Sequence, residues 1–221
     1  MQVSNVAESQ QSKLSETSTK WLHKEITLSI ASAFLFLLIS LIINYFAGTY
    51  ASLHASAVVR DIILDNIPTF DVDGIFIYGI VLFFVFLAGL LLWKPRNAPF
   101  VIKSLSLFII IRSFFIILTH IGPIPQAAII PPDSIAYLFT FTGDLFFSAH
   151  TGLPFLMALF FWHNYWLRAI FLCLSVFFGI VVLFGHLHYS IDVFSAFFIT
   201  YGVFKIAVRL FKKDFKLSQV H

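Results

Sequence analysis

The chain has 221 residues, of which 59% are hydrophobic and only 11% are charged. A water-soluble domain of this length carries about twice that share of charged residues on its surface. The formal net charge of +3 is not the signature of a nucleic-acid-binding protein, so no nucleic-acid partner is expected. Long apolar runs point instead to a protein that crosses a membrane several times.

Six apolar segments each approach the ~20 residues that a helix needs to cross the hydrocarbon core. They are residues 26–46, 74–93, 100–119, 145–162, 166–184 and 191–208. A helix satisfies its own backbone groups in lipid, and the alternating pattern of barrel strands is absent. The sequence therefore predicts an all-α polytopic membrane protein with six transmembrane helices.

The domain organisation that we predict is a single membrane domain over residues 25–211. Residues 1–24 are rich in Ser, Gln and Glu and are predicted to form a disordered cytoplasmic tail. Residues 212–221 are predicted to form a short basic cytoplasmic tail.

The basic residues predict the orientation of the six spans. They gather in or near the two tails and the even-numbered connections, some of them just inside the adjoining span ends: Lys13, Lys20, Lys24, Lys94, Arg96, Lys103, Arg168, Lys205, Arg209, Lys212, Lys213 and Lys216. The opposite connections hold Arg60 among several aspartates. By the positive-inside rule both termini are cytoplasmic, and the odd-numbered connections face the outer side, periplasmic or lumenal.

Two histidine-bearing segments are predicted to meet on that outer side. GDLFFSAHT, residues 143–151, opens the fourth span, and GHLHYSID, residues 185–192, opens the sixth. Both spans run inward, so both present helix N-termini, whose free N–H groups and positive dipole end favour phosphate. Ser148 is placed to cap the fourth helix.

His188 and Asp192 are four residues apart, a spacing that puts them one above the other on a helix face. A carboxylate bonded to one imidazole nitrogen fixes the tautomer and leaves the other nitrogen basic. An aspartate inside a span is costly and tends to be functional. His150, from another helix, is then placed to protonate a leaving oxygen. We predict these three residues as the catalytic set.

Four further residues are candidates for substrate binding: Arg112, Ser148, Asp144 and Tyr189. Arg112 lies in the outer half of the third span, where its planar fork would clamp a phosphate or pair with a buried acid. Asp144 reads equally well as an ordinary loop acid.

FSAHT and HYSIDV resemble the two histidine motifs of the sphingomyelin synthase branch of the type 2 phosphatidic acid phosphatase (PAP2) superfamily. The preceding GD and the stretch IIIRSFFIILTHIGPIPQ also resemble that branch. The resemblance spans roughly residues 60–210 and implies a PAP2-like bundle of six helices. It implies a phosphohistidine mechanism without metal or other cofactor, with His188 as nucleophile, Asp192 as its orienting partner and His150 as acid.

The chain departs from the superfamily pattern at three places. The phosphatases have a Lys-x6-Arg-Pro element, which neither Lys103 nor Arg112 fits, and an arginine where this chain has Val182. These two absences favour the synthase-like branch. The family usually has Gly where this chain has Ala149, which would narrow the approach of a phosphate to the backbone.

The resemblance implies a membrane enzyme acting on a phospholipid or sphingolipid. The expected reaction is cleavage of a phosphoester lipid and transfer of the head group to a lipid hydroxyl, with a lipid phosphate phosphatase as the alternative. Two other classes remain. One is a metal enzyme with His150, His186, His188 and Asp192 as ligands, and the other is a non-catalytic lipid-binding protein.

Overall fold

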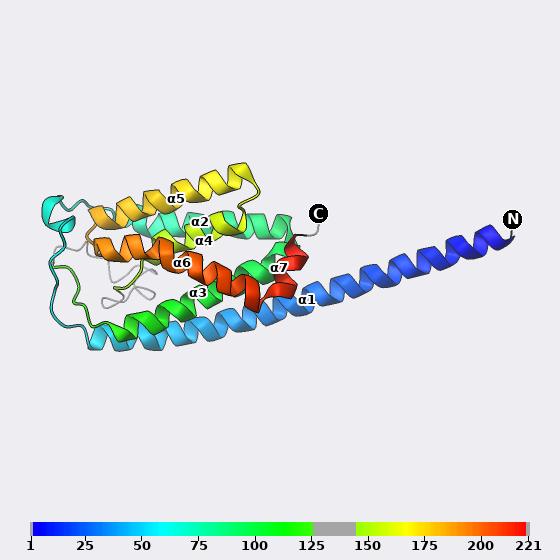
Figure 1. Cartoon of the computed structure of the whole chain (residues 1–221), viewed down its shortest axis with the longest axis horizontal. Helices are drawn as coiled ribbons and strands as arrows, with labels where there is room; N and C mark the ends of the chain where they lie inside the picture. Colours follow the sequence, from blue (N-terminus) through cyan, green and yellow to red (C-terminus); the bar gives the residue numbers. More distant parts are fainter. Residues whose placement is uncertain (1, 126–144, 220–221) are drawn as a thin grey trace.

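The computed structural model describes the backbone of residues 2–125 and 145–219, and the side chains from residue 25 onward. Every regular element in these residues is helical. In chain order they are α1 (Gln2–Leu53), η1 (Leu64–Asn66), α2 (Asp73–Trp93), η2 (Pro95–Asn97), α3 (Ala98–Leu118), α4 (Ala149–Phe160), α5 (Tyr165–Phe184), α6 (Ser190–Leu210) and α7 (Lys212–Ser218) (Figure 1).

Five of the predicted spans are present as helices long and apolar enough to cross a membrane. They are Glu25–Leu53 within α1, Asp73–Trp93, Pro95–Leu118, Tyr165–Phe184 and Ser190–Leu210. Each agrees with the sequence prediction to within a few residues at most ends, and α1 continues further, to Leu53. The all-α, multi-pass membrane fold is therefore confirmed.

The fourth span is shorter than predicted. Residues 145–162 read as one apolar run, but α4 occupies only Ala149–Phe160. At 1.5 Å per residue its 12 residues cover ~18 Å, against ~30 Å for the 20 residues of α5. A short turn joins the end of α4 to the start of α5, and the two helices pack together. The first turn of α4 therefore opens inside the bundle, ~12 Å short of the end of α5.

The bundle is built around α3. Of its apolar stretch 56% is buried, against 11% in α1 and in α2. α1 packs along α3, while α4 lies against α5, α6 and α3. Gly152 lets α4 come close: a Cβ there would lie 2.7 Å from the Phe108 ring and 2.8 Å from the Thr200 hydroxyl oxygen. The start of α4 is thus packed closely against α3 and α6.

The predicted N-terminal tail, residues 1–24, is continuous with α1 from Gln2 onward. The helix begins at Gln2 and leaves the bundle as a long arm (Figure 1). The first 24 residues contain no Gly or Pro, and the adjoining span already supplies the helical turns on which they extend.

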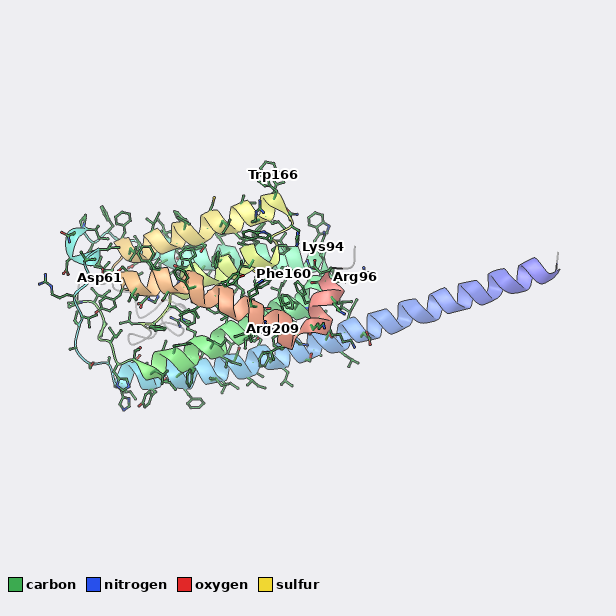
Figure 2. All side chains as sticks on the ribbon, in the orientation of Figure 1. Asp61, Lys94, Arg96, Phe160, Trp166 and Arg209 are labelled. Carbon is green, nitrogen blue, oxygen red and sulfur yellow. The ribbon has the colours of Figure 1, made fainter. Side chains whose placement is uncertain are left out.

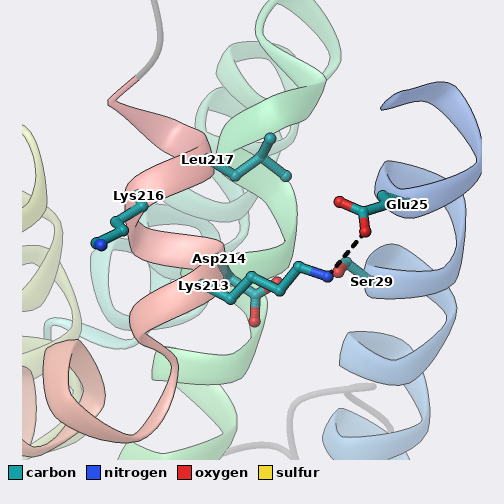
Figure 3. Close-up of a pocket in the computed structure, with 6 residues that line it drawn as sticks. All are labelled: Glu25, Ser29, Lys213, Asp214, Lys216 and Leu217. Atoms are coloured by element: carbon teal, nitrogen blue, oxygen red, sulfur yellow. Dashed lines mark hydrogen bonds and ion pairs between the residues drawn. The ribbon is translucent and has the colours of Figure 1, made fainter. Parts of the chain in front are cut away.

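Most of the predicted C-terminal tail, residues 212–218, forms α7, which folds back onto the bundle. Its Asp214 pairs with Lys103 of α3 at 2.7 Å, and Lys213 pairs with Glu25 of α1 at 3.0 Å. A pocket of about 230 Å³ lies between α7 and α1 (Figure 3). Lys94, Arg96 and Arg209 lie at this same end of the bundle, and Asp61 lies at the other (Figure 2).

Candidate active site

His188 and Asp192 form a buried pair at the start of α6. Nδ1 of His188 lies 3.2 Å from Oδ2 of Asp192, and the two residues are 6% and 0% exposed. A carboxylate only accepts, so the Nδ1–H donates and Nε2 keeps its lone pair. This tautomer is the one that a nucleophilic histidine requires.

The geometry of the pair differs in one respect from the predicted helix face. α6 begins at Ser190, so His188 lies before the helix and Asp192 in its first turn. Oδ2 of Asp192 also accepts the backbone N–H of Tyr189 at 3.1 Å, as the acidic residue of a capping box does. The same oxygen of Asp192 therefore caps the N-terminus of α6 and binds the His188 ring.

The second histidine segment is tied directly to the first. The backbone N–H of Ser148 donates to the carbonyl oxygen of Asp192 at 3.0 Å, so the starts of α4 and α6 meet. Ser148 occupies the N-cap position of α4, but its side chain makes no capping bond. Its Oγ is buried and has no hydrogen-bond partner within the described residues. The expected cap is thus present in position only.

His150 projects from the first turn of α4 toward α2 and α5. Its ring stacks on Phe76 at 4.0 Å between centroids and meets Phe178 edge-on at 5.9 Å. Its Nε2 lies 3.3 Å from the carbonyl oxygen of Phe76, which can only accept, so this nitrogen carries the proton. The Ser148–Asp192 backbone bond and the His188–Asp192 pair thus place the segments that carry the three predicted catalytic residues at adjoining helix starts.

Arg112 reaches the same place from α3. It is 5% exposed, and its Nε donates to the carbonyl oxygen of Phe147 at 3.1 Å. Phe147 has a φ of 22°, outside the usual range for a residue with a side chain, and its ring is fully buried. Arg112 is thus bonded to the bend that lies just before the start of α4.

Tyr189 is buried, and its hydroxyl is engaged with backbone. It donates to the carbonyl oxygen of Gly122 at 3.0 Å and accepts the N–H of Val59 at 3.3 Å. Burial raises the pKa of Tyr189 above its ordinary value of 10.0. Tyr189 therefore connects α6 to two loops. Asp144, the remaining candidate, lies outside the described residues.

Asp61 is a residue at this site whose role the sequence did not indicate. It is 8% exposed, and its Oδ2 accepts the backbone N–H of Ser190 at 2.6 Å. Its Oδ1 accepts the N–H groups of Ile63 and Leu64 at 2.9 and 3.2 Å. Burial alone would raise the pKa of Asp61, but these hydrogen bonds hold it below its ordinary value of 3.8.

The only sequence signal for this role was local. An aspartate that opens the run DIILDN is typical of a residue capping a short turn, and η1 is that turn. The partner Ser190 is 129 positions away and leaves no trace in the sequence near Asp61.

A pocket of about 470 Å³ lies beside this end of α6. Its wall includes residues 58–61, 64, 65 and 67–69 of the loop before α2, and also Ile124, Pro125, His186 and Tyr189. His186 has a φ of 51°, and its Nδ1 lies 3.2 Å from the Thr69 hydroxyl oxygen. In the described part of the chain no three His, Cys, Asp or Glu side chains are grouped to hold a metal.

Residues 142–209 match a family model described as PAP2 superfamily C-terminal. The matched region contains both histidine segments and the helices α4, α5 and most of α6. The match supports membership of the PAP2 superfamily, whose members are phosphatases or phosphotransferases that act on lipid phosphates. No curated protein and no solved structure matches the chain.

Proposed function

We propose that this protein is a membrane lipid phosphotransferase of the sphingomyelin synthase-like kind. It would move a phosphoester head group from one lipid to the hydroxyl of another through a phosphohistidine. The observation that carries the proposal is the buried His188–Asp192 pair, joined to the His150 segment by the bond from the Ser148 N–H to the Asp192 carbonyl. The match to the PAP2 superfamily supports it.

In the first step Nε2 of His188 attacks the phosphorus of the donor lipid. A P–N bond forms, and the P–O bond to the leaving lipid breaks. Asp192 holds the ring through Nδ1–H and stabilises the positive charge that develops on it. His150, in its doubly protonated imidazolium form, gives the Nε2 proton to the leaving oxygen and becomes neutral; for this transfer its N–H must turn away from the Phe76 carbonyl oxygen.

In the second step the direction of proton transfer reverses. His150, now without that proton, takes the proton of the acceptor hydroxyl. The acceptor oxygen forms a new P–O bond as the P–N bond to His188 breaks, which restores the free enzyme. The two steps need no metal and restore the protonation of the enzyme: the leaving lipid gains one proton, and the acceptor hydroxyl loses one.

The charge of the phosphate would be met by α4 and α3. A helix leaves its first N–H groups without partners inside the helix, and these groups bind anions. The Ser148 hydroxyl is buried at that end and has no partner within the described residues. Arg112 brings a positive charge to the same helix end through Phe147. Together these groups would stabilise charge on the phosphate oxygens.

The proposed active side of the membrane is the outer one. Lys94, Arg96 and Arg209 lie at one end of the bundle, and Asp61 lies at the other (Figure 2). Under the positive-inside rule the basic end faces the cytoplasm, so the end that contains Asp61 faces the outer side. On a Cys173-free background, Ile62→Cys should react from outside with an impermeant thiol reagent, since Ile62 is 83% exposed. Lys94→Cys should react only after the membrane is opened; the reverse pattern would place the site in the cytoplasm.

Transfer and hydrolysis share the first step, and the acceptor separates them. A donor lipid labelled in its head group is reconstituted in bilayers that contain either ceramide or diacylglycerol. Label that moves into a new lipid supports transfer. Label that appears only in water, at a rate independent of the acceptor, would make this protein a lipid phosphate phosphatase and overturn the transfer proposal.

A further inference from the structure

We propose that Asp61 is a positioning residue for the reaction, acting through the first turn of α6. This inference rests on the proposed function, but it concerns a residue outside both histidine segments and outside the region matched by the family model. The observation that carries it is the 2.6 Å bond from the N–H of Ser190 to Oδ2 of Asp61.

Ser190 is the first residue of α6 and lies between the two members of the catalytic pair. His188 is two residues before it and Asp192 two residues after it. A shift of Ser190 therefore changes the His188–Asp192 distance of 3.2 Å directly. A displacement of ~1 Å at reacting groups can cost about a hundredfold in rate, so an anchor at this residue matters for chemistry.

Asp61 is itself anchored. Its second oxygen accepts two N–H groups, those of Ile63 and Leu64, which lead into η1. Leu64 is buried with Ile124, Leu145 and Tyr189 in a small apolar cluster. The carboxylate thus connects a packed loop to the helix start, and hydrogen bonds to an ionised acceptor are stronger than neutral ones.

Tyr189 adds a second link between the same parts. Its hydroxyl bridges Val59, two residues before Asp61, and Gly122. The loop before α2 therefore holds both the N-cap residue and the first residue of α6. Asp61 is the charged member of this pair of links, and it is the one that binds the helix backbone.

The matched variants are Asp61→Asn and Asp65→Asn. Both remove one negative charge from the same loop and the same pocket wall. Asp65 pairs with exposed Arg60 at 3.1 Å and does not bond to α6. If Asp61 only supplied charge, the two variants would behave alike.

A third variant removes the same bond from the other side. Ser190→Pro deletes the N–H that Asp61 accepts, and proline is tolerated at the first position of a helix. Tyr189, with φ −67° and ψ 155°, already has the backbone conformation that precedes a proline. This variant leaves the bonds from Ile63 and Leu64 to Asp61 in place, so it tests the link even if Asp61→Asn fails to fold.

The first measurement does not depend on activity. Amide hydrogen exchange is followed in peptides covering residues 185–196 of the full chain in detergent. We expect faster exchange in Asp61→Asn and in Ser190→Pro, and wild-type exchange in Asp65→Asn. Unchanged exchange in either of the first two variants, or an equal effect of Asp65→Asn, would overturn the positioning role.

The second measurement is turnover of the labelled lipid donor. We expect kcat to fall about tenfold to a hundredfold in Asp61→Asn and Ser190→Pro, with KM within about twofold, because binding precedes the misaligned step. Asp65→Asn should keep both constants. A kcat that stays at the wild-type value would overturn the inference. If the wild-type protein shows no turnover, the proposed function fails, and hydrogen exchange alone decides the role of Asp61.

Discussion

The first turns of α6 and α4 meet at the candidate site, but they are held in different ways. At α6, carboxylates bind both the N-cap N–H and the first helical N–H: Asp192 takes that of Tyr189, and Asp61 takes that of Ser190. At α4, the N-cap side chain of Ser148 makes no capping bond, and its hydroxyl has no partner in the described residues.

This difference fits the two tasks that the proposed reaction sets. A nucleophile must be held in one geometry before the substrate binds. The start of α6, whose N-cap and first helical N–H groups are both bonded to carboxylates, would hold the proposed nucleophile His188 in this way. An anion-binding helix end needs donors that are not already engaged, and the Ser148 hydroxyl at the start of α4 has no partner within the described residues. Variants at either helix start, and at the opposite end of the bundle, test this difference.

Removing the proposed nucleophile, His188, from the start of α6 should have the largest effect on turnover. We expect His188→Ala to lower turnover by roughly 10⁴-fold or more, because no neighbouring group replaces an oriented imidazole. His186→Asn is the matched control, since Asn tolerates the positive φ of that position and His186 has no role in the proposed steps. Turnover is measured with the labelled lipid donor in detergent, and several per cent of residual activity in His188→Ala would contradict the mechanism.

Replacing the orienting carboxylate should have the next largest effect. We expect Asp192→Asn to lower kcat by about 10² to 10⁴-fold, less than loss of the nucleophile, because an amide misorients the ring. The bond from the Tyr189 N–H should survive if the amide oxygen takes the place of Oδ2. A variant that folds normally, as judged by thermal unfolding, and keeps wild-type kcat would show that Asp192 serves only as a helix cap.

The sequence predicted contacts between residues close in the chain, but it missed those between distant segments at the starts of both α6 and α4. The His188–Asp192 contact joins residues four apart, so spacing alone places them together, although the helix starts between them. The bond from Ser190 to Asp61 joins residues 129 apart and cannot be read from any local pattern. The short α4 was missed for a related reason. Phe147, at the bend before α4, accepts a hydrogen bond from Arg112, 35 residues away, whereas residues 145–162 alone read as one apolar run.

Removing the Ser148 hydroxyl, which has no partner within the described residues, should lower activity without lowering stability. An N-cap serine replaced by alanine usually costs ~1 kcal/mol of stability. Since Ser148 makes no capping bond, we expect Ser148→Ala to leave the thermal unfolding midpoint nearly unchanged. We also expect kcat/KM to fall by about tenfold to a hundredfold, because a donor to the phosphate is lost. The opposite result, a lower midpoint with full activity, would show that Ser148 caps α4 in solution.

The smallest effect on activity is expected at the other end of the bundle, where a buried ion pair binds no part of the site. Lys103 and Asp214 are 14% and 7% exposed in their side chains and lie 2.7 Å apart. Asp214→Asn leaves Lys103 nearly buried without its counter-charge, which should cost up to about 3 kcal/mol and lower the unfolding midpoint. Glu25→Gln breaks the more exposed pair with Lys213 and should cost under about 1 kcal/mol.

Because the site is held by the starts of α4 and α6 and by the loop at Asp61, both variants should keep wild-type kcat below their unfolding temperatures. A fall in kcat without a fall in the thermal unfolding midpoint would mean that contacts of α7 affect the geometry of the site. The two ends of the bundle would then not be independent.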